Sequence, residues 1–372
     1  MSKKVYKFLD APKKCKGKDY RHCISRLIEK YSKIPGLDAI YGWGEVSQPG
    51  ISDLDIGFVF EKNIDALPFF KRSFFFNSSK VRYLVKHPFI FIDKESFEGI
   101  RYIYPDTNFK LLHGEKIRIK EITKKEAYYA KISLLNDLII RHYPRDFFEQ
   151  QANKSINVRD TLLRLNSIKY TVMTFSSITK KKYKHWNDFI NNVMELRQNW
   201  FKNRDYNSLI SLNSEAMKVS MGIISRFRRF LLENSMVKII SGNEVRYNGI
   251  KNRSIFIPDW SPEKGLNRMA DMARNGRKYY SVLPLELYPQ LVEYSKYNGG
   301  ISSYIRKNIN PEISYELKYK NIAGKRIKIL NSQALLADKL KHSDFAAFFD
   351  FGYRNKSGIN NFMLNLMDKI RF

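Results

Sequence analysis

Two aspartates separated by one residue, Asp53 and Asp55, are the side chains of this sequence best placed to do chemistry. They lie in residues 39–60, where an apolar run and a glycine-rich turn precede them and a second apolar run follows. Side chains on a β-strand alternate between its faces, so both carboxylates would project from the same face. Such a pair repels itself unless a proton or a cation lies between the two groups, and carboxylate oxygens suit Mg²⁺ or Mn²⁺. The spacing therefore predicts a metal site.

The turn before the aspartates contains Gly42, Trp43 and Gly44. Glycine lets the backbone approach a ligand closely, and amide groups in such a turn could point at phosphate oxygens. Ser47 and Ser52 add hydroxyl groups in the same loop. A metal pair beside a phosphate-binding turn describes a site for a metal-bound nucleoside triphosphate (NTP), and ATP is the NTP we expect.

The residues from Tyr41-Gly42 to Ser52-Asp53-Leu54-Asp55-Ile56 resemble the signature of the polymerase-β-like nucleotidyltransferase superfamily. That signature is a hydrophobic residue and a glycine, then a loop, then Asp-x-Asp within an apolar strand. The resemblance covers roughly the first third of the chain. It implies Asp53 and Asp55 as catalytic metal ligands and a third carboxylate on a later strand, for which Asp93 is the first candidate.

The turn departs from the superfamily signature, which has Gly-Ser or Gly-Gly where this chain has Gly42-Trp43. Either Trp43 replaces the serine, or Ser47 supplies a hydroxyl from elsewhere in the loop. We predict that the Trp43 ring stacks on the nucleotide or forms one side of its binding site. Packing of the ring in the core is the alternative.

The expected third strand, residues 81–92, carries His87 where an acid would be expected. A single histidine near an apolar strand is most often a hydrogen-bonded structural residue, so we interpret His87 and His113 in that way.

A second interpretation of the Asp-x-Asp pair is a glycosyltransferase, which uses the same motif to hold a nucleotide-sugar diphosphate. That fold normally builds several strand–helix units before the motif. Too short a segment precedes Asp53 here to supply them, so the nucleotidyltransferase interpretation is favoured.

The chain of 372 residues has a formal net charge of +29. A charge of this size favours acidic partners, so RNA or another polyanionic acceptor is the expected partner besides the NTP. The charge is spread evenly along the sequence, however. A Lys-rich solvated surface with a small-molecule acceptor therefore stays open as the rival interpretation.

No apolar run long enough to span a membrane and no apolar segment typical of a secretory signal is present in the sequence. We therefore expect a cytoplasmic protein without a membrane partner. The two cysteines, Cys15 and Cys23, have no zinc-ligand spacing, and we interpret both as reduced and structural.

The predicted fold class is α+β. A nucleotidyltransferase-like catalytic domain of mixed sheet and helices is expected in residues 1–125, a helical bundle in 126–235, and a mixed α/β region of unknown role in 236–372. A first helix is predicted from Asp19 as N-cap. Ser241-Gly242-Asn243 indicates a hairpin turn between two strands.

Apolar residues at helical spacing predict the bundle. The three stripes are Val158, Leu162, Leu165, Ile168, Val172 and Phe175; Trp186, Phe189, Ile190, Val193, Leu196 and Trp200; and Leu209, Leu212, Val219, Ile223, Phe227 and Phe230. Basic residues off these stripes could bind phosphates or could simply be solvated helix ends. They are Lys180, Lys181, Lys182, Lys184, Arg226, Arg228 and Arg229.

Two hypotheses for the function follow. The first is an enzyme that moves a nucleoside monophosphate from an NTP to an acceptor hydroxyl, with Asp53, Asp55 and Asp93 serving Mg²⁺ or Mn²⁺. The second is a nucleotidyltransferase-like module without catalytic activity that binds nucleic acid or another partner. A third carboxylate beside Asp53 and Asp55 would favour the first hypothesis.

Overall fold

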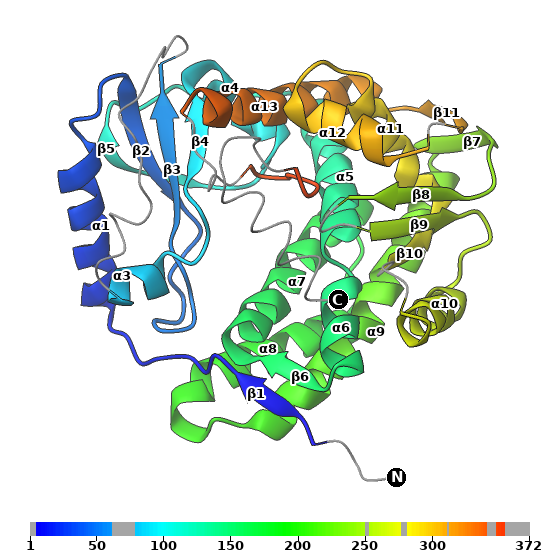
Figure 1. The fold of residues 1–372 in the computed structure, drawn as a ribbon, viewed down its shortest axis with the longest axis horizontal. Helices are drawn as coiled ribbons and strands as arrows, with labels where there is room; N and C mark the ends of the chain where they lie inside the picture. The colour runs from blue at the N-terminus through cyan, green and yellow to red at the C-terminus, as the bar shows by residue number, and fades with distance from the viewer. Residues whose placement is uncertain are drawn as a thin grey trace. The chain divides into compact units, whose positions relative to one another are not determined.

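The computed structural model describes residues 5–61, 79–249, 253–276, 281–310, 312–340 and 347–353, which form an α+β structure (Figure 1). The chain divides into two compact units. The sheet unit contains Cys15–Ala130, Tyr294–Lys307 and Asn321–Phe372, and the helical unit contains Met1–Lys14, Lys131–Glu293 and Asn308–Lys320. Each unit thus combines segments that are distant in sequence. This grouping differs from the three consecutive domains expected from the sequence.

The sheet unit contains a four-stranded mixed sheet in the order β4-β3-β2-β5. Its strands are β2 (Leu37–Trp43), β3 (Asp55–Phe60), β4 (Ile90–Asp93) and β5 (Phe109–Gly114). Strand β3 is antiparallel to β2 and parallel to β4, so it has a neighbour on each side. The described helices of this unit include α1 (Gly17–Tyr31), α3 (Ser79–Leu84), α4 (Lys94–Glu98), η1 (Ile100–Tyr102), α12 (Gly300–Asn308) and most of α13 (Lys320–Lys339).

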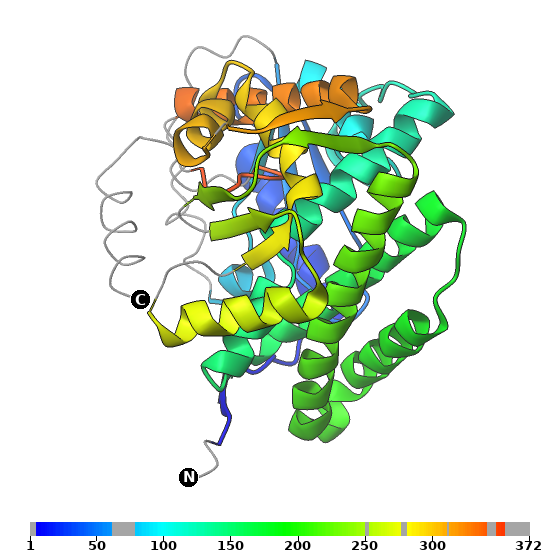
Figure 2. The same ribbon diagram turned by 90° about the vertical axis from the view of Figure 1, so that its right-hand side faces the viewer.

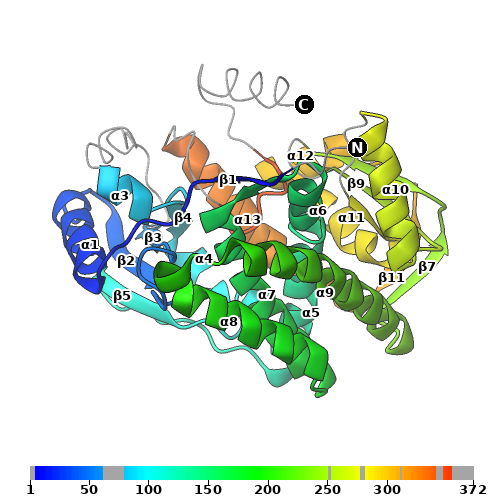
Figure 3. The same cartoon turned by 90° about the horizontal axis from the view of Figure 1, so that it is seen from below.

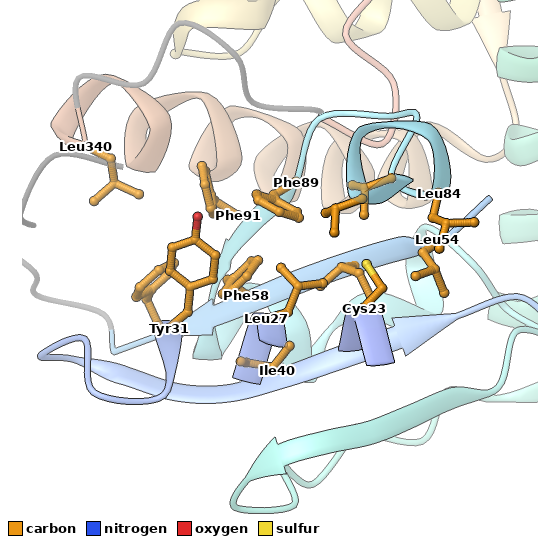
Figure 4. Packing of buried hydrophobic residues seen from close by; sticks show 14 of the residues in the cluster. Cys23, Leu27, Tyr31, Ile40, Leu54, Phe58, Leu84, Phe89, Phe91 and Leu340 are labelled. Atoms are coloured by element: carbon orange, nitrogen blue, oxygen red, sulfur yellow. The ribbon is translucent and has the colours of Figure 1, made fainter. Parts of the chain in front are cut away.

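Helix α1 covers one face of this sheet with an apolar stripe (Figure 4). Cys23, Leu27 and Tyr31 pack against residues of β3 and β4, including Phe58 and Phe91. Burial raises the pKa of the Cys23 thiol to about 12, so this thiol stays protonated at neutral pH. That result agrees with a reduced, structural Cys23.

The start of α1 differs from the sequence-based prediction. The N-cap is Lys16, and Asp19 lies inside the first turn. The carboxylate of Asp19 accepts a hydrogen bond of 2.8 Å from the backbone N–H of Lys16. Asp19 therefore stabilises this end of the helix, because its carboxylate satisfies the backbone N–H of the N-cap residue as in a capping box.

The expected strand of residues 81–92 is wrong over its first half, which forms helix α3 before the short strand β4. Val81 and Leu84 belong to the apolar core under α1. Because they lie three residues apart, a single helical turn buries both of them. This tertiary packing overrides the β-propensity of the segment.

Helix α13 belongs to the sheet unit although it follows the strands by more than two hundred residues. The fully buried Arg326 donates hydrogen bonds to the carbonyl oxygens of Tyr102, at 2.6 Å, and Ile103, at 3.0 Å. Its Nε donates to the hydroxyl of Tyr294 at 3.2 Å. A buried charge needs such partners, so these bonds hold the two chain segments together.

The helical unit is built around three long helices, α7 (Val158–Thr179), α8 (Lys184–Asn203) and α9 (Tyr206–Glu233) (Figure 2 and Figure 3). The predicted stripes are confirmed, because every one of their residues is buried except Ile190, which is half-buried. The shorter helices of this unit are α6 (Arg145–Ala152), α10 (Pro262–Arg274), η2 (Leu285–Leu287) and most of α11 (Tyr288–Ser295). Helix α5 (Lys124–Arg141) has residues in both units.

Three small sheets complete the described part of the helical unit. They pair β1 (Lys7–Leu9) with β6 (Ser155–Asn157), β8 (Val245–Asn248) with β9 (Arg253–Ile257) and β9 with β10 (Ser281–Pro284), and β7 (Val237–Ser241) with β11 (Ser314–Leu317). Strands β7 and β8 lie in different sheets, so the predicted hairpin between them is wrong. Gly242, at φ +117°, lies against the backbone of Glu312 instead and leads the chain from one sheet to the other.

Among the described residues, no helix is both long and apolar enough to cross a membrane.

The helical unit contains a buried cluster of charged side chains around α6. Arg164 Nη1 lies 2.8 Å from Asp146 Oδ2 and 2.9 Å from His142 Nδ1, and Arg145 Nη2 lies 3.3 Å from Asp146 Oδ1. Burial alone would raise the pKa of Asp146, but Arg164, His142 and Arg145 hold it well below its ordinary value. Asp146 is therefore the ionised centre of this cluster.

We predict that Asp146→Asn destabilises the protein by about 3 kcal/mol, because Arg145 and Arg164 then lose their shared countercharge. Urea denaturation followed by circular dichroism measures this change. Glu149→Gln is the matched control, since Glu149 Oε1 lies 3.9 Å from Arg145 Nε and its side chain is 36% exposed. The control should cost less than about 1 kcal/mol, and equal losses in both variants would contradict the central role of Asp146.

Candidate metal and nucleotide site

The sheet places the two aspartates at the start of its interior strand β3. Asp55 is the first residue of β3 and pairs with Trp43, the last residue of β2. Leu54 and Ile56 are buried at 7% and 3% exposure, so the side chains alternate as the sequence predicts. Asp55 is thus the first strand residue, and Asp53, two residues before it in the loop, has its carboxylate close by.

His87 completes a cluster with the two aspartates. One potential ligand atom from each of Asp53, Asp55 and His87 lies within 4.8 Å of the others. His87 Nε2 lies 3.3 Å from Asp53 Oδ2, and the imidazole is 58% exposed whereas the Asp53 side chain is 12% exposed. The aspartates are therefore half-buried, whereas the imidazole lies at the surface.

The position of His87 follows from helix α3 and the parallel strand β4. The backbone N–H of Leu54 donates a 2.9 Å hydrogen bond to the carbonyl of Leu84, the last residue of α3. This bond ties the residue between the two aspartates to a point three residues before His87. Strand β4 then starts beside the first half of β3, where Ile90 pairs with Gly57.

The electrostatics of the pair agree with a cation site. Burial, and then the neighbouring Asp53 carboxylate, raise the pKa of Asp55 to about 8. Asp53 Oδ2 is buried and accepts no hydrogen bond from the described residues, although His87 Nε2 lies 3.3 Å away and would pair with it when protonated. A buried carboxylate oxygen without a donor is costly, and a divalent cation would satisfy it and relieve the repulsion. Two carboxylates with one imidazole suit Mn²⁺, and the carboxylates suit Mg²⁺.

The glycine turn adjoins the pair as the sequence indicates. Gly44 adopts φ +80°, which favours glycine, and a Cβ there would lie 3.8 Å from Asp55 Oδ2. Backbone at this point therefore passes close to the carboxylate without a side chain in between. Such a turn leaves room for a ligand that touches both the backbone and the aspartate.

The two serines have different positions in the loop. Ser52 is buried, and its hydroxyl accepts a 3.2 Å hydrogen bond from the backbone N–H of Gln48. The hydroxyl of Tyr20 on α1 donates to the carbonyl of Ser52 at 2.6 Å. Ser52 thus closes the loop and fixes it to α1, whereas Ser47 is exposed.

Asp93, which the sequence predicts as the third carboxylate of the site, does not lie beside the pair in this structure. Asp93 ends β4 opposite Phe60, five residues along β3 from Asp55, which corresponds to roughly 16 Å. Its carboxylate caps helix α4 by accepting a 2.8 Å hydrogen bond from the N–H of Ser96, and it also accepts one from the hydroxyl of Ser332. Asp93 is therefore a structural N-cap.

Trp43 is packed within the sheet unit. A Cβ on Gly57 of the neighbouring strand would lie 2.1 Å from the Trp43 ring, so the indole lies directly over this glycine. Its centroid lies 5.8 Å from that of Phe109 and 5.6 Å from that of Phe348. These contacts agree with the alternative prediction for Trp43, which is packing in the core. They do not test stacking on a nucleotide, because the ring is also half-exposed.

The sequence has His87 at the place of an acid and favours a structural role for it, whereas the structure places it in the cluster. Its Asp-x-Asp neighbours were visible as a motif, whereas its proximity to them depends on the three-dimensional course of residues 79–90. His113 lies on β5 opposite Ile40, on the other side of β2 from β3, and is not part of the cluster.

Comparisons of this chain with protein-family models, curated proteins and solved structures found no match. The assignment of the site therefore depends on the residues and geometry described above.

We predict that Mn²⁺ binds this site and that Asp55→Asn abolishes binding. The proton on Asp55 competes with the cation below a pKa of about 8, so affinity should rise as the pH increases from 6 to 8 and then level off. Isothermal titration calorimetry at several pH values measures this. Asp93→Asn is the control, because asparagine caps helices as well as aspartate does. Loss of binding in the control would restore Asp93 to the site.

We predict that Gly57→Ala destabilises the protein by about 1 to 3 kcal/mol, because the new methyl group meets the Trp43 ring. In a double-mutant cycle with Trp43→Leu, the double variant should lose less stability than the sum of the single variants. Gly99→Ala is the control, since its Cβ would make only ordinary contacts, the nearest at 3.5 Å. Strictly additive losses would show that Trp43 does not rest on Gly57.

Proposed function

We propose that this chain is a metal-dependent nucleotidyltransferase that transfers a nucleoside monophosphate from an NTP to an acceptor hydroxyl. One observation carries the proposal: Asp53, Asp55 and His87 bring three potential ligand atoms within 4.8 Å of one another, beside the turn at Gly44. The proposed NTP is ATP and the proposed acceptor is RNA, in keeping with the net charge of +29.

In this proposal Asp53 and Asp55 hold the cation, and His87 supplies a third ligand from the exposed rim. A bound Mg²⁺ or Mn²⁺ would neutralise charge on the phosphates and lower the pKa of the attacking hydroxyl. The backbone around Gly44 would position the triphosphate beside Asp55. The loop closed by Ser52 and Tyr20 would keep this turn in place relative to the aspartates.

The alternative is a nucleotidyltransferase-like module that binds nucleic acid or another partner without catalysis. Two observations favour it. His87 occupies the place of the third carboxylate that the superfamily signature implies, and Trp43, which stands where the signature has serine or glycine, packs over Gly57. A neutral imidazole carries no negative charge, so it would hold a hard cation such as Mg²⁺ less strongly than a carboxylate would.

We predict that the protein transfers label from an NTP to RNA and that Asp53→Asn and Asp55→Asn abolish this transfer. Each labelled NTP is incubated with the protein, Mg²⁺ or Mn²⁺ and total cellular RNA, and both the RNA and the small products are separated and counted. Asp93→Asn should keep its activity, because Asp93 caps α4 instead of serving the site.

Label in a small product and none in RNA would move the acceptor to a small molecule. Activity that persists in both aspartate variants would remove the chemistry from this site. Metal and RNA binding without any transfer would favour the non-catalytic module.

A further inference from the structure

The turn between α7 and α8 carries the highest local density of positive charge in the helical unit. Residues 180–186 read KKKYKHW and contain four lysines, one histidine and no acid. All four lysines are exposed, and the first turn of α8 contains no acidic residue. Within the described residues, no ion pair involves Lys180, Lys181, Lys182 or Lys184. This charge is thus not neutralised by described neighbours.

Helix α9 adds a fifth positive charge to the same surface. The guanidinium of Arg226 lies 5.0 Å from the ring centroid of Tyr183 and 5.8 Å from that of Trp186. The centroids of these two rings lie 4.3 Å apart; Tyr183 stands between Lys182 and Lys184 in sequence, and Trp186 follows Lys184 by two residues. Cation–π contact with the rings holds the guanidinium of Arg226 at this surface, where its N–H groups could donate to a phosphate.

Arg228, two residues further along α9, is bound within the protein instead. Arg228 donates hydrogen bonds to Glu286 Oε1 at 2.9 Å and to the carbonyls of Trp260 at 2.8 Å and Pro258 at 2.5 Å. Its charge is used within the protein. Of the arginines that could have bound phosphates according to the sequence, Arg228 is therefore structural, whereas Arg226 is exposed beside the lysines.

We propose that this surface, formed by Lys180, Lys181, Lys182, Lys184 and Arg226, binds the phosphate backbone of single-stranded RNA. Point charges on flexible lysines recognise a phosphate chain without reading its sequence. Tyr183 and Trp186 already stack on each other and on Arg226, so they support the basic groups and do not stack on bases. The surface would hold the acceptor strand in the proposed function, and in that role the inference rests on that function.

RNA fits this surface better than an anionic membrane does. A membrane-surface element inserts large apolar side chains next to its basic residues. The exposed large hydrophobic residues that the structure describes on α7 and α8 are Tyr170, Met173 and Met194; none of them lies in the basic turn 180–186, where Trp186 is only 5% exposed. This surface therefore interacts through its positive charge, which suits a polyanion in water.

The test is fluorescence anisotropy of a labelled oligouridylate with the full chain, without NTP or metal. The variant combines Lys181→Ala, Lys182→Ala and Lys184→Ala. The matched control combines Lys202→Ala, Lys218→Ala and Lys328→Ala, which removes the same charge from exposed helix positions elsewhere. Circular dichroism verifies that both variants are folded.

For the wild type, log K should fall with log salt with a slope of roughly −3 or steeper. The turn variant should bind at least about tenfold more weakly and have a slope shallower by about 2, because three phosphate contacts are lost. The control variant should stay within about threefold of the wild type. Asp53→Asn should bind as the wild type does, so a failed transfer reaction and a failed binding surface are distinguishable.

Equal losses in the turn and control variants would overturn the proposal and make RNA binding a property of the overall charge. No binding at about 50 mM salt would overturn it as well. Lysine-dependent binding to vesicles containing phosphatidylserine, with none to RNA, would assign the surface to a membrane.

Discussion

Repulsion between two carboxylates at the start of β3 is the constraint on which the candidate site depends. Asp55 is paired with Trp43 of β2, so it cannot move away from Asp53 without breaking this pairing. Burial strengthens the repulsion because the low dielectric screens it poorly. The raised pKa of Asp55 is one relief and a divalent cation is the other. A fold that keeps such a pair in place spends stability on it, which is typical of functional sites.

The surrounding structure is arranged so that this strained pair stays where it is. Tyr20 on α1 holds the preceding loop through the carbonyl of Ser52, and the end of α3 holds Leu54 between the two aspartates. On the other side, Trp43 lies over Gly57 and fixes the end of β2, from which the turn at Gly44 begins. The bulk of Trp43 at this turn, unusual for the superfamily signature, is thereby matched by the absence of a side chain at residue 57.

Local patterns in the sequence were sufficient for some of this structure and insufficient for the rest. The stripes of α7, α8 and α9 were predictable because helical spacing is a property of neighbouring residues. The helix at Val81, the separate sheets of β7 and β8, and the return of α13 to the sheet unit were not predictable. Each depends on a partner far away in sequence, such as α1 for Val81 and the carbonyl of Tyr102 for Arg326. Propensity and turn chemistry carry no information about such partners.

His87, the third residue of the candidate site, shows the same limit of sequence-based prediction at the level of single residues. His87 precedes β4 and Asp93 ends it, so the direction of this one strand decides which of them lies beside the aspartates. Strand β4 runs parallel to β3, which brings its beginning to Asp55 and carries its end to Phe60. The residue types were therefore readable from the sequence, but the choice between a histidine and a third acid was made by topology.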